Sequence, residues 1–208
     1  MKFCLPDIPV VVLTIKPNTQ RHTTLRAFLE SHNYKNVQWH YGRITRNHHE
    51  GARESASEVL GSIVAPTLWL EDDTITTDKY MDSIDIPDDS QVAYLGGSCM
   101  GATIHGRRIA KTESGWMMQQ AKRCIGGNAH YTDTADQNWV RLISMLSGHA
   151  ILWLDTALCR ELSKMLTGVR CTYDHALALN QWRYRVYCIR YPWFIQSNKR
   201  VRTGVYCP

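Results

Sequence analysis

Apolar and polar residues are grouped along the first third of the chain in a strand–helix–strand–helix–strand order. A nearly continuous β-branched run at residues 8–15 is typical of a strand that is buried on both faces. Polar and apolar residues alternate at 36–41, as in a half-buried strand, and a short apolar run ends at Leu70. Apolar residues at helical spacing predict helices over 23–33 and 50–63. This order predicts an α/β fold with a mostly parallel central sheet flanked by helices.

The pattern after residue 73 predicts further elements within the same single domain, residues 1–208. Residues 97–136 lack a clear period, and we expect an irregular acceptor-binding or lid loop there. The tail at 192–208 is expected to form an extended basic arm. The remaining expected elements are a short helix at 78–84, a strand at 92–95, a short helix near 116–122, an ordered stretch at 139–145, a strand at 148–154, a helix to about 166 capped by Asp155, a helix at 176–182 opened by 173–175, and a strand at 185–189.

Three consecutive acids follow the third apolar run directly: Glu71, Asp72 and Asp73. Because side chains alternate along a strand, Glu71 and Asp73 should point to one side and Asp72 to the other. Carboxylates this close repel one another unless a cation compensates. A divalent ion with oxygen ligands, such as Mn²⁺ or Mg²⁺ gripping a diphosphate, would do so. The alternative is an ordinary acidic turn in contact with water alone.

Composition excludes several classes of protein. The 208 residues are 44% hydrophobic and 21% charged, as in soluble globular proteins. No apolar run approaches the ~20 residues of a membrane span, and the first residues do not resemble a signal peptide. We therefore expect a cytoplasmic protein, in the host cytoplasm if the chain is viral. The seven cysteines are an odd number without a C-x-x-C pair, which argues against a zinc site or a disulfide framework.

The net charge of +5 is concentrated near the end of the chain. Residues 181–208 contain six basic residues, no acid and several aromatic residues. Basic residues between aromatic ones can follow a phosphate backbone and stack on bases. The same alternation also arises in a core strand with one solvated face. Both interpretations remain open on the sequence alone.

A ligand of an open parallel sheet binds beyond the carboxyl ends of its strands. Residues 14–21, 71–73 and 96–99 would all lie at that edge. They contain a basic side chain, Arg21, a cluster of carboxylates and flexible glycines. These are the groups that a nucleotide diphosphate with a bridging metal needs.

Four stretches in this order resemble the glycosyltransferases of lipopolysaccharide-biosynthesis type, the family that includes the collagen β-galactosyltransferases. The stretches, which together span about residues 10–197, are Val12-Leu13-Thr14-Ile15 with Arg21, Gly51-Ala52-Arg53-Glu54-Ser55, Leu70-Glu71-Asp72-Asp73, and Gly148-His149-Ala150 followed by Asp174, Tyr191-Pro192 and Gln196. The chain departs from the family's pattern at Thr14-Ile15 and Ala56. The resemblance implies a GT-A-like fold with a Rossmann-like nucleotide-binding half and transfer from a UDP-sugar, with inversion.

The resemblance also implies roles for the donor-binding residues. Asp73 would bind Mn²⁺ or Mg²⁺. Glu71 would contact the metal through water or hold the donor ribose, and Asp72 would orient the sugar or support the loop. Arg21 would face the nucleotide. The residues Thr14 and Gly97, at the same expected edge, complete the predicted donor-binding set.

Three further residues are candidates for the acceptor side. Asp174 is the candidate general base that takes the proton of the acceptor hydroxyl. Its position also suits an ordinary helix N-cap. His149 and His175 compete for a secondary role as metal ligand or acceptor contact, and His149 could equally be a structural histidine at the start of a strand.

The sequence thus predicts a metal-dependent glycosyltransferase with a nucleotide-sugar donor. The acceptor would be a saccharide or a hydroxylated base in nucleic acid, the latter suiting a viral or phage enzyme that modifies DNA. One alternative is a non-catalytic nucleic-acid-binding protein on a degenerate transferase fold. Another is a nucleotidyltransferase, which would release pyrophosphate instead of a nucleoside diphosphate.

Overall fold

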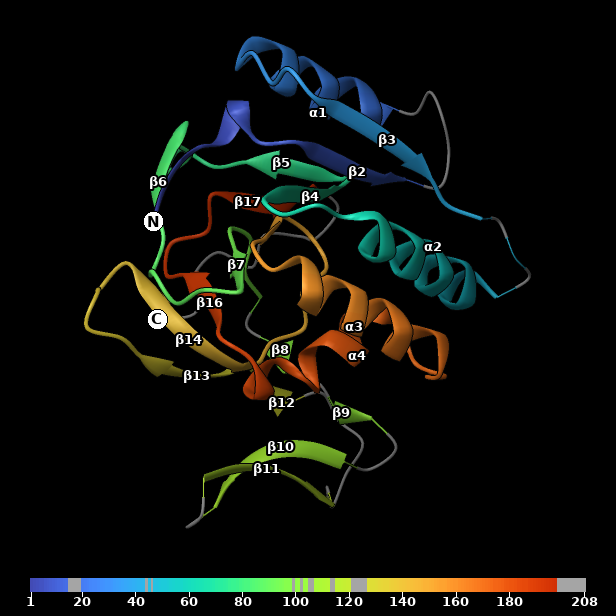
Figure 1. Ribbon diagram of the computed structural model, residues 1–208, viewed down its shortest axis with the longest axis vertical. Coiled ribbons are helices and arrows are strands. Elements are labelled where there is room, and N and C mark those ends of the chain that lie inside the picture. The colour runs from blue at the N-terminus through green and yellow to red at the C-terminus, as the bar shows by residue number, and fades with distance from the viewer. Residues whose placement is uncertain are drawn as a thin grey trace.

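An eight-stranded sheet forms the centre of the molecule (Figure 1). The computed structural model describes residues 1–14, 20–43, 45, 47–98, 100–101, 103–104, 107–112, 115–120 and 127–197. The strands lie in the order β13 (His130–Asp133), β14 (Trp139–Ser144), β16 (Val186–Ile189), β7 (Val92–Tyr94), β15 (Ile151–Trp153), β4 (Thr67–Glu71), β2 (Val10–Thr14) and β3 (Val37–Tyr41).

The sheet is mixed, which corrects the expectation of a mostly parallel one. β3, β2 and β4 are parallel, as are β7 and β16. β15 lies antiparallel between β4 and β7, and β14 and β13 continue the sheet antiparallel beyond β16. All three residues of β15 are buried. A strand buried on both faces has the same apolar pattern in either direction, so the sequence did not give the direction of β15.

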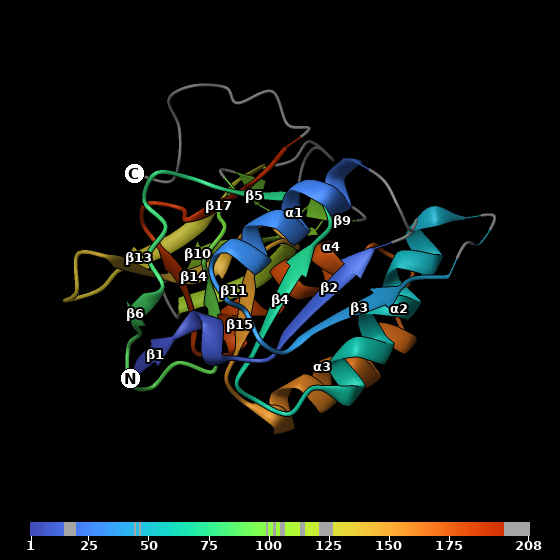
Figure 2. The same cartoon turned by 90° about the horizontal axis from the view of Figure 1, so that it is seen from above.

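Helices cover both faces of the sheet (Figure 2). α1 (Gln20–Ser31) packs on one face, while α2 (His48–Ser62), α3 (Thr156–Thr167) and α4 (Tyr173–Ala178) pack on the other. β4 shows how the alternation of side chains divides the core. Leu68 and Leu70 belong to the apolar cluster on the α1 side, and Trp69 belongs to the cluster on the opposite side.

Side-chain caps explain where two of the helices begin. Asn47 precedes α2, and its side chain accepts a hydrogen bond from the His49 amide at 3.1 Å. Asp155 precedes α3 and accepts from the next two free amides, Ala157 and Leu158, at 2.9 and 3.0 Å. The predicted Asp155 cap is therefore confirmed. The alternative interpretation of Asp174 as an N-cap is wrong, because Thr172 holds the N-cap position of α4 and Asp174 lies in the first turn.

Residues 78–84 do not form the predicted helix. They form a turn that leads into β6 (Ser83–Asp85), which pairs with β1 (Lys2–Cys4) ahead of the short helix η1 (Leu5–Asp7). After the acids, β5 (Thr74–Thr76) pairs instead with β17 (Phe194–Gln196), the described part of the expected C-terminal arm. Both pairings join segments far apart in the sequence, which a local pattern cannot reveal.

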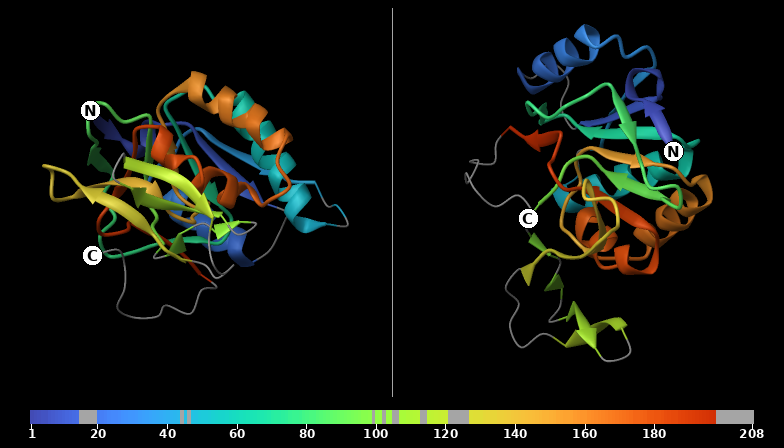
Figure 3. Two further views of the ribbon diagram at one scale, coloured as in Figure 1. Left: turned by 90° about the horizontal axis from the view of Figure 1, so that it is seen from below. Right: turned by 90° about the vertical axis from the view of Figure 1, so that its left-hand side faces the viewer.

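The described part of 97–136 is mostly strand, so the expected irregular loop is also corrected. β10 (Arg107–Thr112) and β11 (Gly115–Gln120) form a hairpin that stands away from the central sheet (Figures 1 and 3). β11 replaces the helix expected near 116–122. β9 (Thr103–Ile104) extends the hairpin, and β8 (Met100–Gly101) pairs with β12 (Gly127–Asn128).

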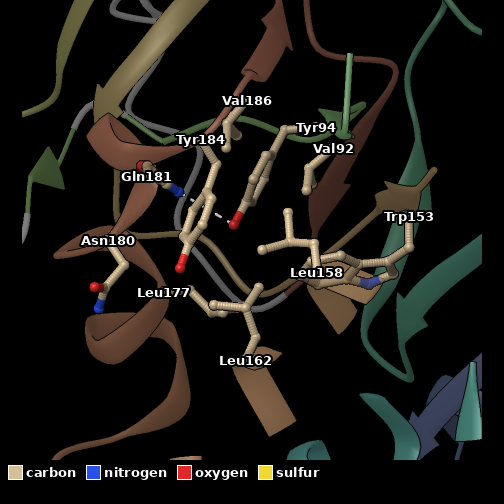
Figure 4. Close-up of a pocket in the computed structure, with 10 residues that line it drawn as sticks. All are labelled: Val92, Tyr94, Trp153, Leu158, Leu162, Leu177, Asn180, Gln181, Tyr184 and Val186. Atoms are coloured by element: carbon tan, nitrogen blue, oxygen red, sulfur yellow. Dashed lines mark hydrogen bonds between the residues drawn. The ribbon is translucent and has the colours of Figure 1, made fainter. Parts of the chain in front are cut away.

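A small apolar pocket lies between the sheet and the helices α3 and α4 (Figure 4). Gln181, in the short helix η2 (Gln181–Arg183), donates to the Tyr94 hydroxyl at 3.1 Å along its wall. The pocket leaves room for about 10 Å³, the space of roughly one water. It is therefore a packing gap rather than a substrate site. Within the described part of the chain, no helix has the length and apolar character needed to cross a membrane.

Candidate functional site at the sheet edge

The carboxyl ends of β2, β3 and β4 lie at one edge of the sheet (Figure 2). The carboxyl end of β7 lies at the same edge, because β15 is antiparallel to both β4 and β7. The Gly42 amide, after β3, donates to the Thr14 carbonyl at 2.6 Å, and the Asp72 amide donates to the Leu13 carbonyl at 3.1 Å. β15 starts at the same edge, because the Leu95 amide donates to the Ala150 carbonyl at 2.8 Å. Of the three segments predicted to share this edge, the described parts Thr14, 71–73 and 96–98 do so, and residues 15–19 and 99 lie outside the described residues.

Glu71 lies on the α4 side of the sheet, and both of its carboxylate oxygens are hydrogen-bonded. The Tyr173 hydroxyl donates to Oε1, and Gln196 Nε2 donates to Oε2 at 2.6 Å. Burial raises the pKa of Glu71 to about 7, helped by the negative charges of Asp73 and Asp174. Burial and the Glu71 carboxylate together raise the pKa of Tyr173 well above its ordinary value, so Tyr173 stays protonated as a donor.

Two glycines allow this close packing. A Cβ at Gly148 would lie 2.8 Å from Glu71 Oε1 and closer still to the Tyr173 hydroxyl. A Cβ at Gly96 would lie 2.5 Å from the His149 ring. Gly97, the glycine predicted to bind the donor, has only ordinary contacts, at 3.4 Å or more. The glycines that the packing requires are therefore Gly96 and Gly148.

Asp72 points to the opposite side of the sheet from Glu71, as the strand alternation predicted. Its Oδ2 accepts from the Thr14 hydroxyl at 2.7 Å and lies 3.3 Å from His22 Nε2. Thr14 Oγ1 in turn lies 2.5 Å from His22 Nε2. Thr14 thus contacts the acidic turn, while the side chain of Arg21 lies outside the described part of the structure.

Asp73 follows in the turn between β4 and β5 and is partly buried. Its backbone carbonyl accepts from the Ser197 amide at 2.8 Å, which joins the turn to the end of the described chain. The negative charge of Asp73, two residues further along the chain, contributes to the raised pKa of Glu71. The basic arm from residue 198 onwards lies outside the described residues.

Asp174, in the first turn of α4, is held by its neighbours. Its Oδ1 accepts from the Thr172 hydroxyl and, at 2.9 Å, from the His175 amide. Burial pushes the pKa of Asp174 upward, but the hydrogen bonds from His175 and Thr172 outweigh burial, and the pKa is lowered. His175 Nδ1 lies 2.7 Å from the Thr172 hydroxyl and 3.5 Å from Asp174.

The predicted ligand set Asp73, Glu71 and His175 does not come together. Among the described residues, no three His, Cys, Asp or Glu side chains lie close enough to enclose a metal. His175 pairs with Asp174 instead, and His149 is buried beneath Gly96 with Nδ1 3.2 Å from Ser147 Oγ. Carboxylate oxygens do suit Mn²⁺ and Mg²⁺, and these ions are commonly shared between one or two carboxylates, water and a substrate phosphate. The residues therefore fit a shared ion and not a protein-only cage.

The described part of the basic aromatic segment is mostly structural. Tyr187, Trp193 and Phe194 are buried in the core, where bases cannot stack on them. Arg190 pairs with Asp133 at 2.7 Å, and Arg185 donates to the Asp89 carbonyl at 2.6 Å. This favours the interpretation of a core strand with a solvated face.

The sequence assigned no role in the site to His22, Tyr173, Gln196 or Gly148, and it included Gly96 only as a flexible glycine of the ligand edge. Gly148 and Gln196 entered only as marks of the family resemblance, and Tyr173 only as the start of a helix. His22 carries no local signal, since its partners are 8 and 50 residues away. The chain matches no protein-family model and no curated protein.

Proposed function

We propose that this protein is a metal-dependent glycosyltransferase of GT-A-like fold that uses a nucleotide-sugar donor. One observation carries the proposal. Glu71, which precedes Asp72 and Asp73 at the end of β4, accepts a hydrogen bond from Tyr173, the neighbour of Asp174 in α4, so a distant part of the chain brings a further acid to this edge. Negative charge is thereby concentrated at the sheet edge where α/β proteins bind their ligands. A donor diphosphate with a divalent cation matches that chemistry, and a UDP-sugar is the donor we expect.

Each residue at this edge has a separate role in the proposed reaction. Asp73, the acid in the turn, would hold the ion together with the donor phosphates. A bound Mn²⁺ or Mg²⁺ would neutralise charge on the leaving diphosphate. Glu71 is fixed by Tyr173 and Gln196, so it can present one orientation to the donor. Gly96 and Gly148 keep Cβ atoms out of the space beside His149 and Glu71.

Asp174 remains the proposed general base. Its lowered pKa keeps it ionised at neutral pH, and Oδ2 has no hydrogen-bond partner among the described residues. That oxygen can accept the proton of an acceptor hydroxyl as the hydroxyl attacks the anomeric carbon. The acceptor class, saccharide or hydroxylated base, and a role of residues 97–136 in binding it remain part of this proposal.

The test is release of nucleoside diphosphate from a panel of nucleotide sugars, with Mn²⁺ or with EDTA. We expect the wild type to hydrolyse at least one donor slowly, and only with metal. Asp73→Asn should reduce the rate about a hundredfold, since it removes charge at the reacting phosphates. Asp78→Asn is the matched control, because its side chain is 83% exposed.

Three results would contradict the proposal: no release of nucleoside diphosphate from any donor, release that EDTA does not reduce, or an Asp73→Asn hydrolysis rate equal to that of the Asp78→Asn control. Release of pyrophosphate would indicate a nucleotidyltransferase. A non-catalytic nucleic-acid binder would bind DNA in a salt-dependent manner without any donor hydrolysis. The burial of Tyr187, Trp193 and Phe194 gives that alternative little support.

A further inference from the structure

The turn that carries the acids is fixed to β2 by both backbone and side chain. The Asp72 amide donates to the Leu13 carbonyl at 3.1 Å, and its carboxylate accepts from the Thr14 hydroxyl at 2.7 Å. Asp72 lies between Glu71 and Asp73, so any movement of Asp72 also moves its two neighbours. The orientation of the acid turn therefore depends on what holds Thr14 and Asp72 in place.

His22 is the residue that completes this contact. A hydroxyl has one proton, and Thr14 gives it to Asp72, so Thr14 Oγ1 accepts from His22 Nε2 at 2.5 Å. The same Nε2 lies 3.3 Å from Asp72 Oδ2. The result is a hydrogen-bonded chain that runs from the first turn of α1, through the end of β2, to the acid turn.

The imidazole itself is held in one orientation. His22 is 4% exposed, and its ring packs on the Trp39 indole of β3 at a centroid distance of 5.1 Å. The guanidinium of Arg26 lies over the Trp39 ring, also at 5.1 Å. Nε2 is thus directed at Thr14 and Asp72 by packing from α1 and β3.

We propose that His22 is a positioning residue of the donor site, which acts through Thr14 and Asp72 to hold the acid turn in its binding geometry. This inference rests on the proposed function. It assigns Asp72 the part of a tether between β2 and the turn, in place of a direct contact with metal or sugar. Sites that bind charged groups depend on such supporting hydrogen bonds.

Two amide substitutions separate positioning from simple core packing. The amide of His22→Gln can reach the place of Nε2, whereas the shorter amide of His22→Asn reaches only the place of Nδ1. Both variants put a polar amide in the same buried site. If the Nε2 contact matters, Gln should rescue function and Asn should not.

The experiment measures binding of UDP with Mn²⁺ by calorimetry, together with donor KM, kcat and urea unfolding for each variant. We expect His22→Asn to weaken UDP–Mn²⁺ binding and to raise KM about tenfold with a small change in kcat, because one hydrogen bond to Thr14 is lost. His22→Gln should stay within about twofold of the wild type. Thr14→Val and Thr14→Ser repeat the comparison on the next link of the chain, in case a His22 variant does not fold.

Equal UDP–Mn²⁺ binding by His22→Asn, His22→Gln and wild type overturns the positioning role, whatever their stabilities. Equal weakening in both His22 variants also overturns it, because only bulk or burial would then matter. A wild type that neither binds UDP with Mn²⁺ nor hydrolyses a donor refutes the proposed function, and this inference with it. These results are distinguishable, since only the last is seen without any substitution.

Discussion

Two acids at opposite edges of the same sheet show how differently one fold treats a carboxylate. Asp155 follows β15 at one edge, where it caps α3 and accepts from Gln91 Nε2 at 2.7 Å. Its hydrogen bonds with Gln91 and the helix amides lower its pKa. Glu71 ends β4 at the other edge, where burial and two nearby acids raise its pKa to about 7. Ionised Asp155 stabilises the fold, whereas ionised Glu71 destabilises it. A buried acid with a raised pKa is typical of a functional site.

The largest expected effect is the pH dependence of stability caused by Glu71. Its pKa rises from 4.5 to about 7 on folding. Between these pH values the unfolded chain releases a proton that the folded chain keeps, so stability falls as pH rises and then levels off above about 7. The loss is on the order of 3 kcal/mol. Urea unfolding in metal-free buffer should show this fall in the wild type.

Glu71→Gln should remove that slope, because a glutamine does not titrate. Asp155 should change the stability in the opposite direction and over a different pH range. The stabilisation by its ionised form is present above pH 3.8 and is lost as pH falls further. A wild-type stability that is flat between pH 4.5 and 7, or one unchanged by Glu71→Gln, would contradict the burial of an acid at this edge.

The contrast between the edges also marks what the sequence could predict. Asp155 was predicted as a cap because a cap is local: the acid and the amides it accepts are three residues apart or fewer. The acid cluster and its sheet edge were predicted as well, since strand alternation and chain order determine them. The partners of Glu71 were not, because Tyr173 and Gln196 lie 102 and 125 residues away. The hairpin of β10 and β11 was missed for a different reason: its partners are only 3 to 13 residues apart, but residues 97–136 have no clear strand period.

Gly148→Ala should disturb the Glu71 edge most among small substitutions. The added Cβ would lie 2.8 Å from Glu71 Oε1 and would displace that carboxylate or Tyr173. We expect a loss of about 2 kcal/mol, as for overpacked cores, measured by urea unfolding. Gly168→Ala is the matched control at the end of α3, where φ is −95° and the Cβ would lie 3.7 Å from the nearest atom. It should gain about 0.5 kcal/mol. Equal effects in the two variants would show that the space beside Glu71 is not restricted.

Asp155→Ala should weaken the fold and leave the donor site intact. It removes the cap of α3 and the bond from Gln91, for a loss of about 1.5 kcal/mol in urea unfolding. Asp155→Ser keeps a capping oxygen and should recover most of that loss. Donor hydrolysis per folded molecule should match the wild type in both variants. A fall in that specific rate would mean that the two edges are coupled and not independent.

The smallest effects come from the two glutamines that donate to these acids, and they separate the edges by pH. Gln91→Leu should cost about 1 kcal/mol at both about pH 5 and about pH 8, because Asp155 is ionised at either pH. Gln196→Leu should cost less at the lower pH, where Glu71 is protonated, and more at the higher pH, since a hydrogen bond to an ionised acceptor is the stronger one. Unfolding curves at the two pH values give the four costs directly. The size of each cost is less informative than its change with pH: a cost of Gln196→Leu that stays constant would mean that Glu71 has the same charge at both pH values, and that the two edges hold their acids alike.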